Sequence, residues 1–124
     1  MLEYAAPVWS PWFKKDIKAL ESVQVRCLKL TKANTELESL QGRRETTDLV
    51  ETYKLLNGHY KSNPENFFSN PNRQLRGHSS KLFVSRSKTE VRRNFFSNRV
   101  VKPWNKLPED VVAAPTLDEF KQML

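Results

Sequence analysis

The chain has 124 residues, of which 38% are hydrophobic and 28% charged, and its formal net charge is +7. This length corresponds to one domain or to part of a larger one, and a single cysteine excludes both a disulfide framework and a cysteine-rich zinc site. No apolar run approaches the roughly 18–20 residues of a membrane span, and the N-terminus lacks the pattern of a signal peptide. We therefore expect an intracellular protein, nuclear or cytoplasmic, without a membrane partner.

The N-terminal part of the sequence predicts one long helix. Residues 1–9 are apolar and start without a cap, which suggests the end of an element that begins elsewhere. Ser10-Pro11 is a typical helix start, and apolar residues at helical spacing then predict an amphipathic helix over about 12–32. Cys27 lies on its apolar side, so we expect a buried structural thiol there.

The middle of the chain predicts shorter elements. A second helix is expected over about 46–57, where Asn57-Gly58 is a natural stop, and Gly42 argues against an earlier start. Asn63-Pro64-Glu65 can open a short helix that carries Phe67 and Phe68. Residues 69–80 have the composition of a loop, and residues 81–84 form a candidate strand.

The last third of the chain predicts two further helices. Residues 88–102 are expected to be helical with Val91, Phe95 and Phe96 facing inward, until Pro103 ends or kinks the helix. Thr116 to Glu119 matches a capping box, so a final helix should follow, with Phe120 and Leu124 on its inner face.

Together these elements predict a mainly α fold, a small helical domain or fragment with at most one short β element. We expect two segments, a helical one over 1–58 and a basic one over 59–124, packed as one unit or forming an incomplete domain. Both ends of the sequence resemble interrupted elements, which favours a fragment of a longer protein.

The positive charge is concentrated in one stretch. Residues 73–106 contain ten Lys and Arg side chains and one acid, Glu90, whereas the rest of the chain carries a small negative balance. A concentrated basic stretch attracts polyanions. It is therefore either a segment that faces nucleic acid or a solvated face of a basic protein.

Residue patterns for catalysis or metal binding are missing. The two histidines, His59 and His78, are far apart in sequence, and neither has a partner at metal-ligand spacing. Glu109-Asp110 follows a Leu-Pro break and is expected to begin a helical turn rather than to perform acid–base work. We expect no cofactor, no metal and no independent enzyme activity.

Aromatic residues alternate with the basic ones, at Phe83, Phe95, Phe96 and Trp104. Exposed rings beside cations are the usual equipment for binding single-stranded nucleic acid. The same rings can instead form the core of a segment that is poor in aliphatic residues. Burial is the favoured interpretation for Phe95, Phe96 and Trp104, which leaves Arg and Lys as the better candidates for ligand contact.

Three segments of the chain resemble a known family, and with matching residues between and after them, such as Leu20-Glu21-Ser22-Val23-Gln24 and Ala114-Pro115, the resemblance extends over nearly the whole chain. The three segments are Leu2-Glu3-Tyr4-Ala5-Ala6-Pro7-Val8-Trp9-Ser10-Pro11, then Tyr53-Lys54-Leu55-Leu56-Asn57-Gly58, and finally the stretch from Arg76-Gly77-His78-Ser79 through Arg92-Arg93-Asn94-Phe95-Phe96-Ser97-Asn98-Arg99 to Trp104-Asn105-Lys106-Leu107-Pro108. In order and spacing they resemble the C-terminal part of the reverse transcriptase of a non-LTR (LINE-type, jockey-like) retrotransposon, a transposable element.

This resemblance implies a region that follows the polymerase palm, with a thumb-like first segment and a basic C-terminal extension. The family's RNA-directed DNA polymerase activity depends on palm aspartates that bind two metal ions, and its endonuclease domain also lies upstream. Neither is in this sequence, so the resemblance implies descent from an RNA-directed DNA polymerase and does not imply polymerase activity of this chain. Residues 31–47 form a shorter connection than the family usually has.

The sequence thus predicts binding of RNA or DNA, RNA binding in the parent enzyme included, together with contact to the remainder of a reverse transcriptase. The expected phosphate-contacting residues are Arg76, His78, Lys81, Arg86, Arg92, Arg93, Arg99, Lys102 and Lys106. Two alternatives remain open at this stage. One is a structural or protein-interaction module of helices, and the other is a truncated retrotransposon relic without independent activity.

Overall fold

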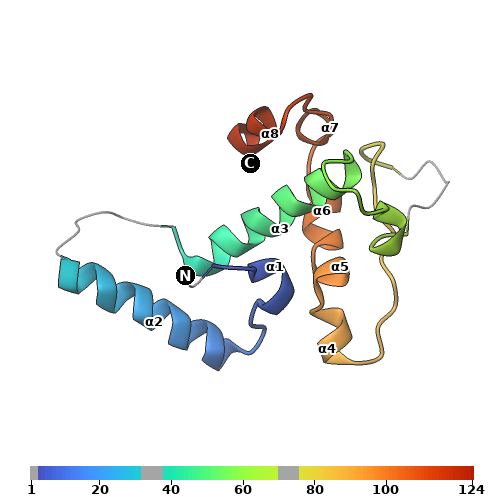
Figure 1. Ribbon diagram of the computed structural model, residues 1–124. Coiled ribbons are helices and arrows are strands. Elements are labelled where there is room, and N and C mark those ends of the chain that lie inside the picture. Colours follow the sequence, from blue (N-terminus) through green and yellow to red (C-terminus); the bar gives the residue numbers. More distant parts are fainter. Residues whose placement is uncertain (1–2, 32–37, 70–75) are drawn as a thin grey trace. The chain divides into compact units, whose positions relative to one another are not determined.

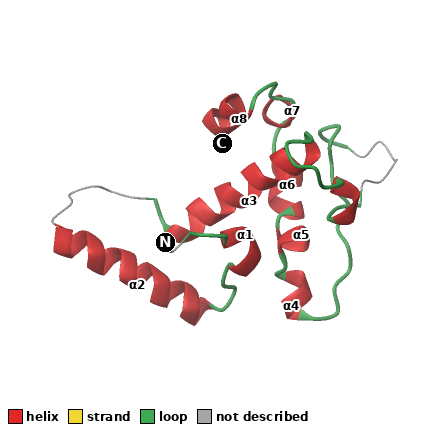
Figure 2. Ribbon diagram, viewed as in Figure 1, coloured by secondary structure: helices red, strands yellow, loops and turns green. Residues whose placement is uncertain are grey.

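The computed structural model describes residues 3–31, 38–69 and 76–124, and the chain is mainly helical, as predicted (Figure 1). Within these described ranges no strand forms (Figure 2), and no helix is long and apolar enough to cross a membrane. The chain divides into two compact units, Met1–Thr47 and Asp48–Leu124. The division falls inside α3 (Leu40–Leu56), whereas the sequence indicated a division after Gly58.

The first unit contains α1 (Ala6–Trp9), α2 (Lys14–Thr31) and the start of α3. The long helix predicted over 12–32 is confirmed as α2. It begins later than predicted because Ser10 belongs to the end of α1, where its backbone N–H donates to the carbonyl of Ala6 at 2.9 Å.

Polar contacts join α2 to the residues that precede and begin α3. The carboxylate of Glu21 accepts a hydrogen bond from the Gln41 backbone N–H at 3.1 Å. Gln24, the polar residue in the apolar stripe of α2, accepts a hydrogen bond from the guanidinium of Arg43. No residue of α2 is buried, and Cys27 is exposed, so the prediction of a buried thiol is wrong. Ile17, Leu20, Gln24 and Leu28 on that side are only half-buried, so the described residues cover it in part.

Helix α3 starts earlier than the sequence predicts and stops where expected. Gly42 lies in its first turn, and the Gly42 N–H donates to the hydroxyl of Ser39 at 3.0 Å. At the other end Gly58 has a φ of 71°, and the His59 N–H reaches back to the Lys54 carbonyl at 3.0 Å. This is a Schellman ending, which requires the left-handed conformation that glycine adopts without strain.

The predicted short helix near Asn63 is a single 3-10 turn, η1 (Pro64–Asn66). The Asn63 side chain accepts a hydrogen bond from the Glu65 N–H at 3.0 Å and so begins the turn. Of the two phenylalanines that follow, Phe68 is buried and Phe67 is exposed.

The second unit has one hydrophobic core, built around Tyr53, Trp104 and Phe120. The rings of Tyr53 and Phe120 stack with centroids 4.4 Å apart, and the Tyr53 hydroxyl donates to the Ala114 carbonyl at 2.6 Å. The remaining buried members of this cluster are Val50, Leu55, Phe68, Leu82, Phe96, Val100, Val101, Val111, Val112 and Ala114.

The C-terminal helices complete this core. They are α7 (Glu109–Val112), which begins at Glu109 as predicted, and α8 (Leu117–Met123). The capping box is confirmed in its first half, since the Thr116 hydroxyl accepts from the Glu119 N–H at 3.3 Å. Phe120 is buried, but Leu124 is exposed, because it lies beyond the last helical residue.

The expected strand over 81–84 is wrong. Leu82 is buried and extended, but a side chain takes the place of a partner strand. The Leu82 N–H donates to Asn105 Oδ1 at 2.9 Å, and Asn105 Nδ2 donates to the Leu82 carbonyl at 2.8 Å. This pair of bonds satisfies the backbone as a neighbouring strand would.

The single helix expected over 88–102 is also wrong in part. The structure forms α4 (Glu90–Arg93), α5 (Phe96–Arg99) and α6 (Val101–Lys106), which follow one another closely (Figure 1). The break lies at Phe95, whose ψ of 145° is extended. Pro103 does not end the helix. It lies in the first turn of α6, where its missing N–H has no intrahelical partner to lose.

Candidate nucleic-acid interface

We refer to residues 76–106 as the basic segment. It consists of a loop with bends and a turn over 76–80, a stretch without helix or strand over 81–89, called the extended stretch below, and the three short helices α4–α6. Arg73, the first cation of the predicted basic stretch, lies outside the described residues.

Asn98 fastens the extended stretch to the short helices. Its Oδ1 accepts a hydrogen bond from the Ser85 hydroxyl at 2.7 Å, and its Nδ2 donates to the Arg92 carbonyl at 2.6 Å. The same Nδ2 lies 3.4 Å from the hydroxyl of Ser87. Asn98 therefore holds Ser85 and Ser87, which flank the exposed Arg86, beside α4 and α5.

Arg99 forms the main ion pair of the unit. Its Nε and Nη2 donate to the two carboxylate oxygens of Asp48 at 2.7 and 2.9 Å, and its Nη1 donates to the Asn94 carbonyl at 3.1 Å. The side chains of Arg99 and Asp48 are only 18% and 8% exposed. A guanidinium held in this way ties α5 to α3, and we leave Arg99 out of the interface.

His78 is likewise part of the interior, with 4% exposure. Its Nε2 lies 3.1 Å from the Trp104 carbonyl, which accepts only, so Nε2 carries the proton. The imidazole also packs edge-on against the Trp104 ring, and the Trp104 indole N–H donates to the Ser80 carbonyl at 2.9 Å. His78 therefore anchors the loop to α6 and presents no edge to a ligand.

The neighbouring loop residues are also fixed by the protein. The Ser79 N–H and hydroxyl donate to the two carboxylate oxygens of Glu109 at 2.8 and 2.9 Å. The ammonium of Lys81 donates to the Arg76 carbonyl and lies against Gly77. The Lys81 ammonium therefore already has one hydrogen-bond partner within the protein, whereas the Arg76 side chain is exposed.

The other cations of the basic segment face solvent. Arg93 is exposed and forms an ion pair with Glu90 one turn before it in α4. The remaining exposed cations form no side-chain hydrogen bond or ion pair with any described residue, and we call them the free cations: Arg76, Arg86, Lys88, Arg92, Lys102 and Lys106. Lys88 belongs to this group although it is not among the contacts expected from the sequence.

The rings of the basic segment divide into two pairs. Phe96 and Trp104 are buried, as predicted. Phe95 is 57% exposed and Val91 69% exposed, so the prediction that these two residues face inward is wrong. Phe83 is 53% exposed. Because the helix is interrupted at Phe95, the Phe95 ring is exposed while the adjacent Phe96 ring is buried. No glycine or proline marks this break in the sequence.

A second polar cluster lies in the same unit, outside the basic segment. The Glu51 carboxylate accepts hydrogen bonds from Lys54 Nζ at 2.7 Å and from the Tyr60 hydroxyl at 2.5 Å. Partial burial acts to raise the pKa of Glu51, but the hydrogen bonds from Lys54 and Tyr60 outweigh it and lower the pKa. The same bonds raise the pKa of Lys54 and of Tyr60.

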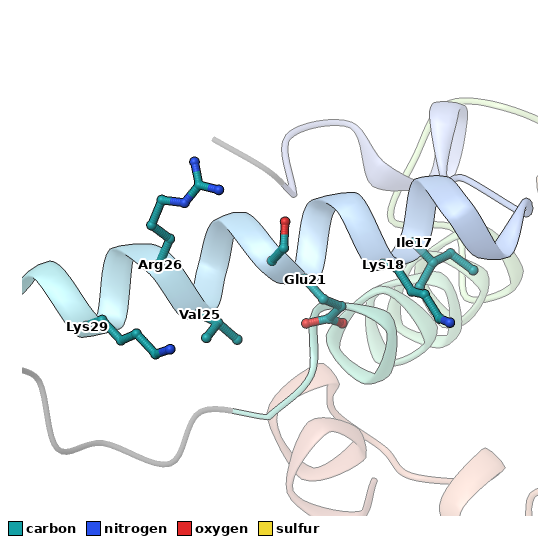
Figure 3. Close-up of a pocket in the computed structure, with 7 residues that line it drawn as sticks. Ile17, Lys18, Glu21, Val25, Arg26 and Lys29 are labelled. Carbon is teal, nitrogen blue, oxygen red and sulfur yellow. The ribbon is translucent and has the colours of Figure 1, made fainter.

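A shallow hollow lies on α2 and is lined only by residues of that helix, including Ile17, Val25 and Arg26 (Figure 3). A site lined by one helix face has no opposing wall, so it lacks the enclosure of a small-molecule pocket. The described residues contain no group of three His, Cys, Asp or Glu side chains that could hold a metal ion.

Comparison with protein-family models, with curated proteins and with solved structures finds no match to this chain.

Proposed function

We propose that this chain is a nucleic-acid-binding, non-catalytic C-terminal portion of a retrotransposon RNA-directed DNA polymerase. The observation that carries the binding proposal is the set of free cations on the basic segment. Other side chains fasten the loop, the extended stretch and the short helices, so these cations are not needed for internal pairing. The retrotransposon origin rests on the sequence resemblance alone.

The free cations suit a phosphate backbone better than a compact anion. They come from several elements, namely the loop, residues 86–88, α4 and α6, and none of them has an acidic partner among the described residues. Contacts to phosphates add affinity without reading sequence. We therefore expect binding that depends little on base order and strongly on ionic strength.

A salt titration tests this proposal. If about five phosphates are neutralised on single-stranded RNA, log affinity should fall with log salt at a slope near −3.5. The variant Arg86→Glu/Lys88→Glu/Arg92→Glu should bind much more weakly and reduce the steepness of that slope by about 2. These three side chains have no partner among the described residues, so the variant should keep its helical circular dichroism spectrum.

The matched control is Lys14→Glu/Lys15→Glu/Lys18→Glu on α2, which changes the net charge equally at exposed positions. It should retain most of the wild-type affinity and slope. Equal losses in both variants would mean that only net charge matters, and an interaction that ignores salt would contradict the proposal.

The exposed apolar residues of α2 favour one other candidate, a structural module that packs on another protein. Val23, Val25 and Leu30 are all exposed, and no residue of this helix is buried. Sedimentation at high and low salt separates the two candidates, because apolar self-association persists at high salt whereas phosphate binding is screened.

A further inference from the structure

We infer that the basic segment selects single-stranded nucleic acid, with Phe83 and Phe95 as stacking platforms for unpaired bases. This inference rests on the proposed function and adds a ligand class to it. Base stacking on an aromatic ring is available only where bases are not paired and stacked within a duplex. It tolerates any base, because every base has a π-face.

Both rings are held outward by ordered backbone. The Phe83 N–H donates to the Ser69 carbonyl at 2.9 Å, next to Leu82, whose side chain enters the core. The Phe95 carbonyl accepts from the Asn98 and Arg99 N–H groups, each at 2.9 Å, and Phe96 enters the core. In each pair one side chain is buried and its neighbour is exposed, so the buried member fixes the direction of the ring beside it.

Exposure of these rings is costly unless they have a ligand. Burial of a phenylalanine side chain stabilises a fold, and both rings, which are more than half exposed, forgo a large part of that stabilisation. The chain has other exposed rings outside the basic segment, such as Phe67. Only Phe83 and Phe95 are exposed within it, among the free cations.

Cations that lie close to the rings in the sequence supply the phosphate contacts of such a site. Arg86 and Lys88 follow Phe83 in the stretch that Asn98 fastens to α4 and α5, and Arg92 precedes Phe95. A single strand can then place phosphates on the cations and bases on the rings. A duplex can use only the cations.

The test compares wild type with Phe83→Leu/Phe95→Leu, which keeps apolar bulk but removes the rings. Fluorescence anisotropy is measured with oligouridine, oligothymidine, an abasic sugar-phosphate strand of equal length and a duplex. Stacking contributes about 1–3 kcal/mol per base, so single-strand affinity should fall at least roughly fivefold per ring. Affinity for the abasic strand and the duplex should not change.

Two controls keep the result interpretable. Phe67→Leu removes an exposed ring outside the basic segment and should leave every affinity unchanged. Phe83→Tyr/Phe95→Tyr keeps the rings and should retain single-strand affinity, which separates stacking from a folding defect.

Unchanged single-strand affinity of the leucine variant would overturn the inference, as would equal losses on abasic and duplex ligands. Loss of self-association in the leucine variant, without loss of single-strand affinity, would also overturn it, since the rings would then dock on protein. Wild-type protein that binds none of the four polyanions would overturn the proposed function as well. Salt-dependent binding of all four with no effect of the rings would overturn the inference and leave the proposed function in place.

Discussion

Asn98 and Asn105 hold together backbone in the second unit that neither a sheet nor a long helix satisfies. Asn105 pairs with both backbone groups of Leu82, and Asn98 joins Ser85 to the carbonyl of Arg92. An asparagine side chain can do this because its amide carries the same donor and acceptor as a peptide unit. These two asparagines therefore serve the fold.

The ion pair of Arg99 with Asp48 offers a direct test of whether a polar side chain of the basic segment stabilises the fold. Arg99→Ala should lower the free energy of unfolding by about 3 kcal/mol, because it leaves the Asp48 carboxylate largely buried without this partner. Urea unfolding measures the loss. Arg86→Ala, at an exposed cation, should stay within about 0.5 kcal/mol of wild type. A similar small effect at Arg99 would show that the ion pair does not stabilise the unit.

The Glu51 cluster predicts a pH dependence of stability. The pKa of Glu51 is lower in the folded chain than in the unfolded one, so the unfolded state binds more protons as the solution is acidified. The contribution is complete above the ordinary carboxyl range and is lost as the pH falls through and below about 4. Urea unfolding of wild type and Glu51→Gln across this window should give curves that converge at low pH. Curves that stay parallel would contradict the assignment.

At the scale of elements, helix ends are the features that local sequence specifies best. Gly58 is required by its left-handed φ and by the bond from His59 to Lys54, whereas Gly42 lies in the regular first turn of α3. A Cβ at Gly42 would meet only the flexible carboxylate end of Glu38 closely.

These two glycines should therefore respond in opposite directions to alanine. Gly58→Ala should destabilise the protein by about 1 kcal/mol, and Gly42→Ala should be neutral or stabilising by about 0.5 kcal/mol. Thermal unfolding of the two variants measures the difference. Equal destabilisation by both would mean that α3 does not begin or end at the observed residues.

Sequence patterns were sufficient for α2, for the Gly58 ending and for the Thr116 cap, because these depend on residues within a few positions of one another. They were not sufficient for the pairing of Arg99 with Asp48 or of Asn105 with Leu82, which joins distant residues. The break at Phe95 was missed because no local signal opposes a helix there, and tertiary burial of Phe96 decides it. For the candidate site, the location of positive charge was predictable, but the burial of His78 and Arg99 was not.

At the scale of the whole molecule, the two units differ in the number of hydrophobic residues that they bury. The described core cluster lies entirely between Val50 and Phe120, within the second unit, whereas α2 buries no residue. An isolated helix of its length is marginal in water. We expect the second unit to carry the cooperative stability of the chain.

A fragment of residues 40–124, which keeps α3 whole, should therefore fold cooperatively and retain salt-dependent binding of single-stranded RNA. Circular dichroism during urea unfolding, followed by the binding assay, checks both points. A fragment that is helical but loses binding would assign the interface to the first unit and contradict its location on the basic segment.

Binding of nucleic acid to the basic segment of the second unit is tested most directly by chemical-shift perturbation of ¹⁵N-labelled protein with a short oligouridine, because every amide reports its own surroundings. The predicted result is a set of perturbed amides at residues 83–95 and near Lys102 and Lys106, with α2 unaffected. Perturbation centred on α2, or spread evenly over all exposed lysines, would contradict binding at the basic segment.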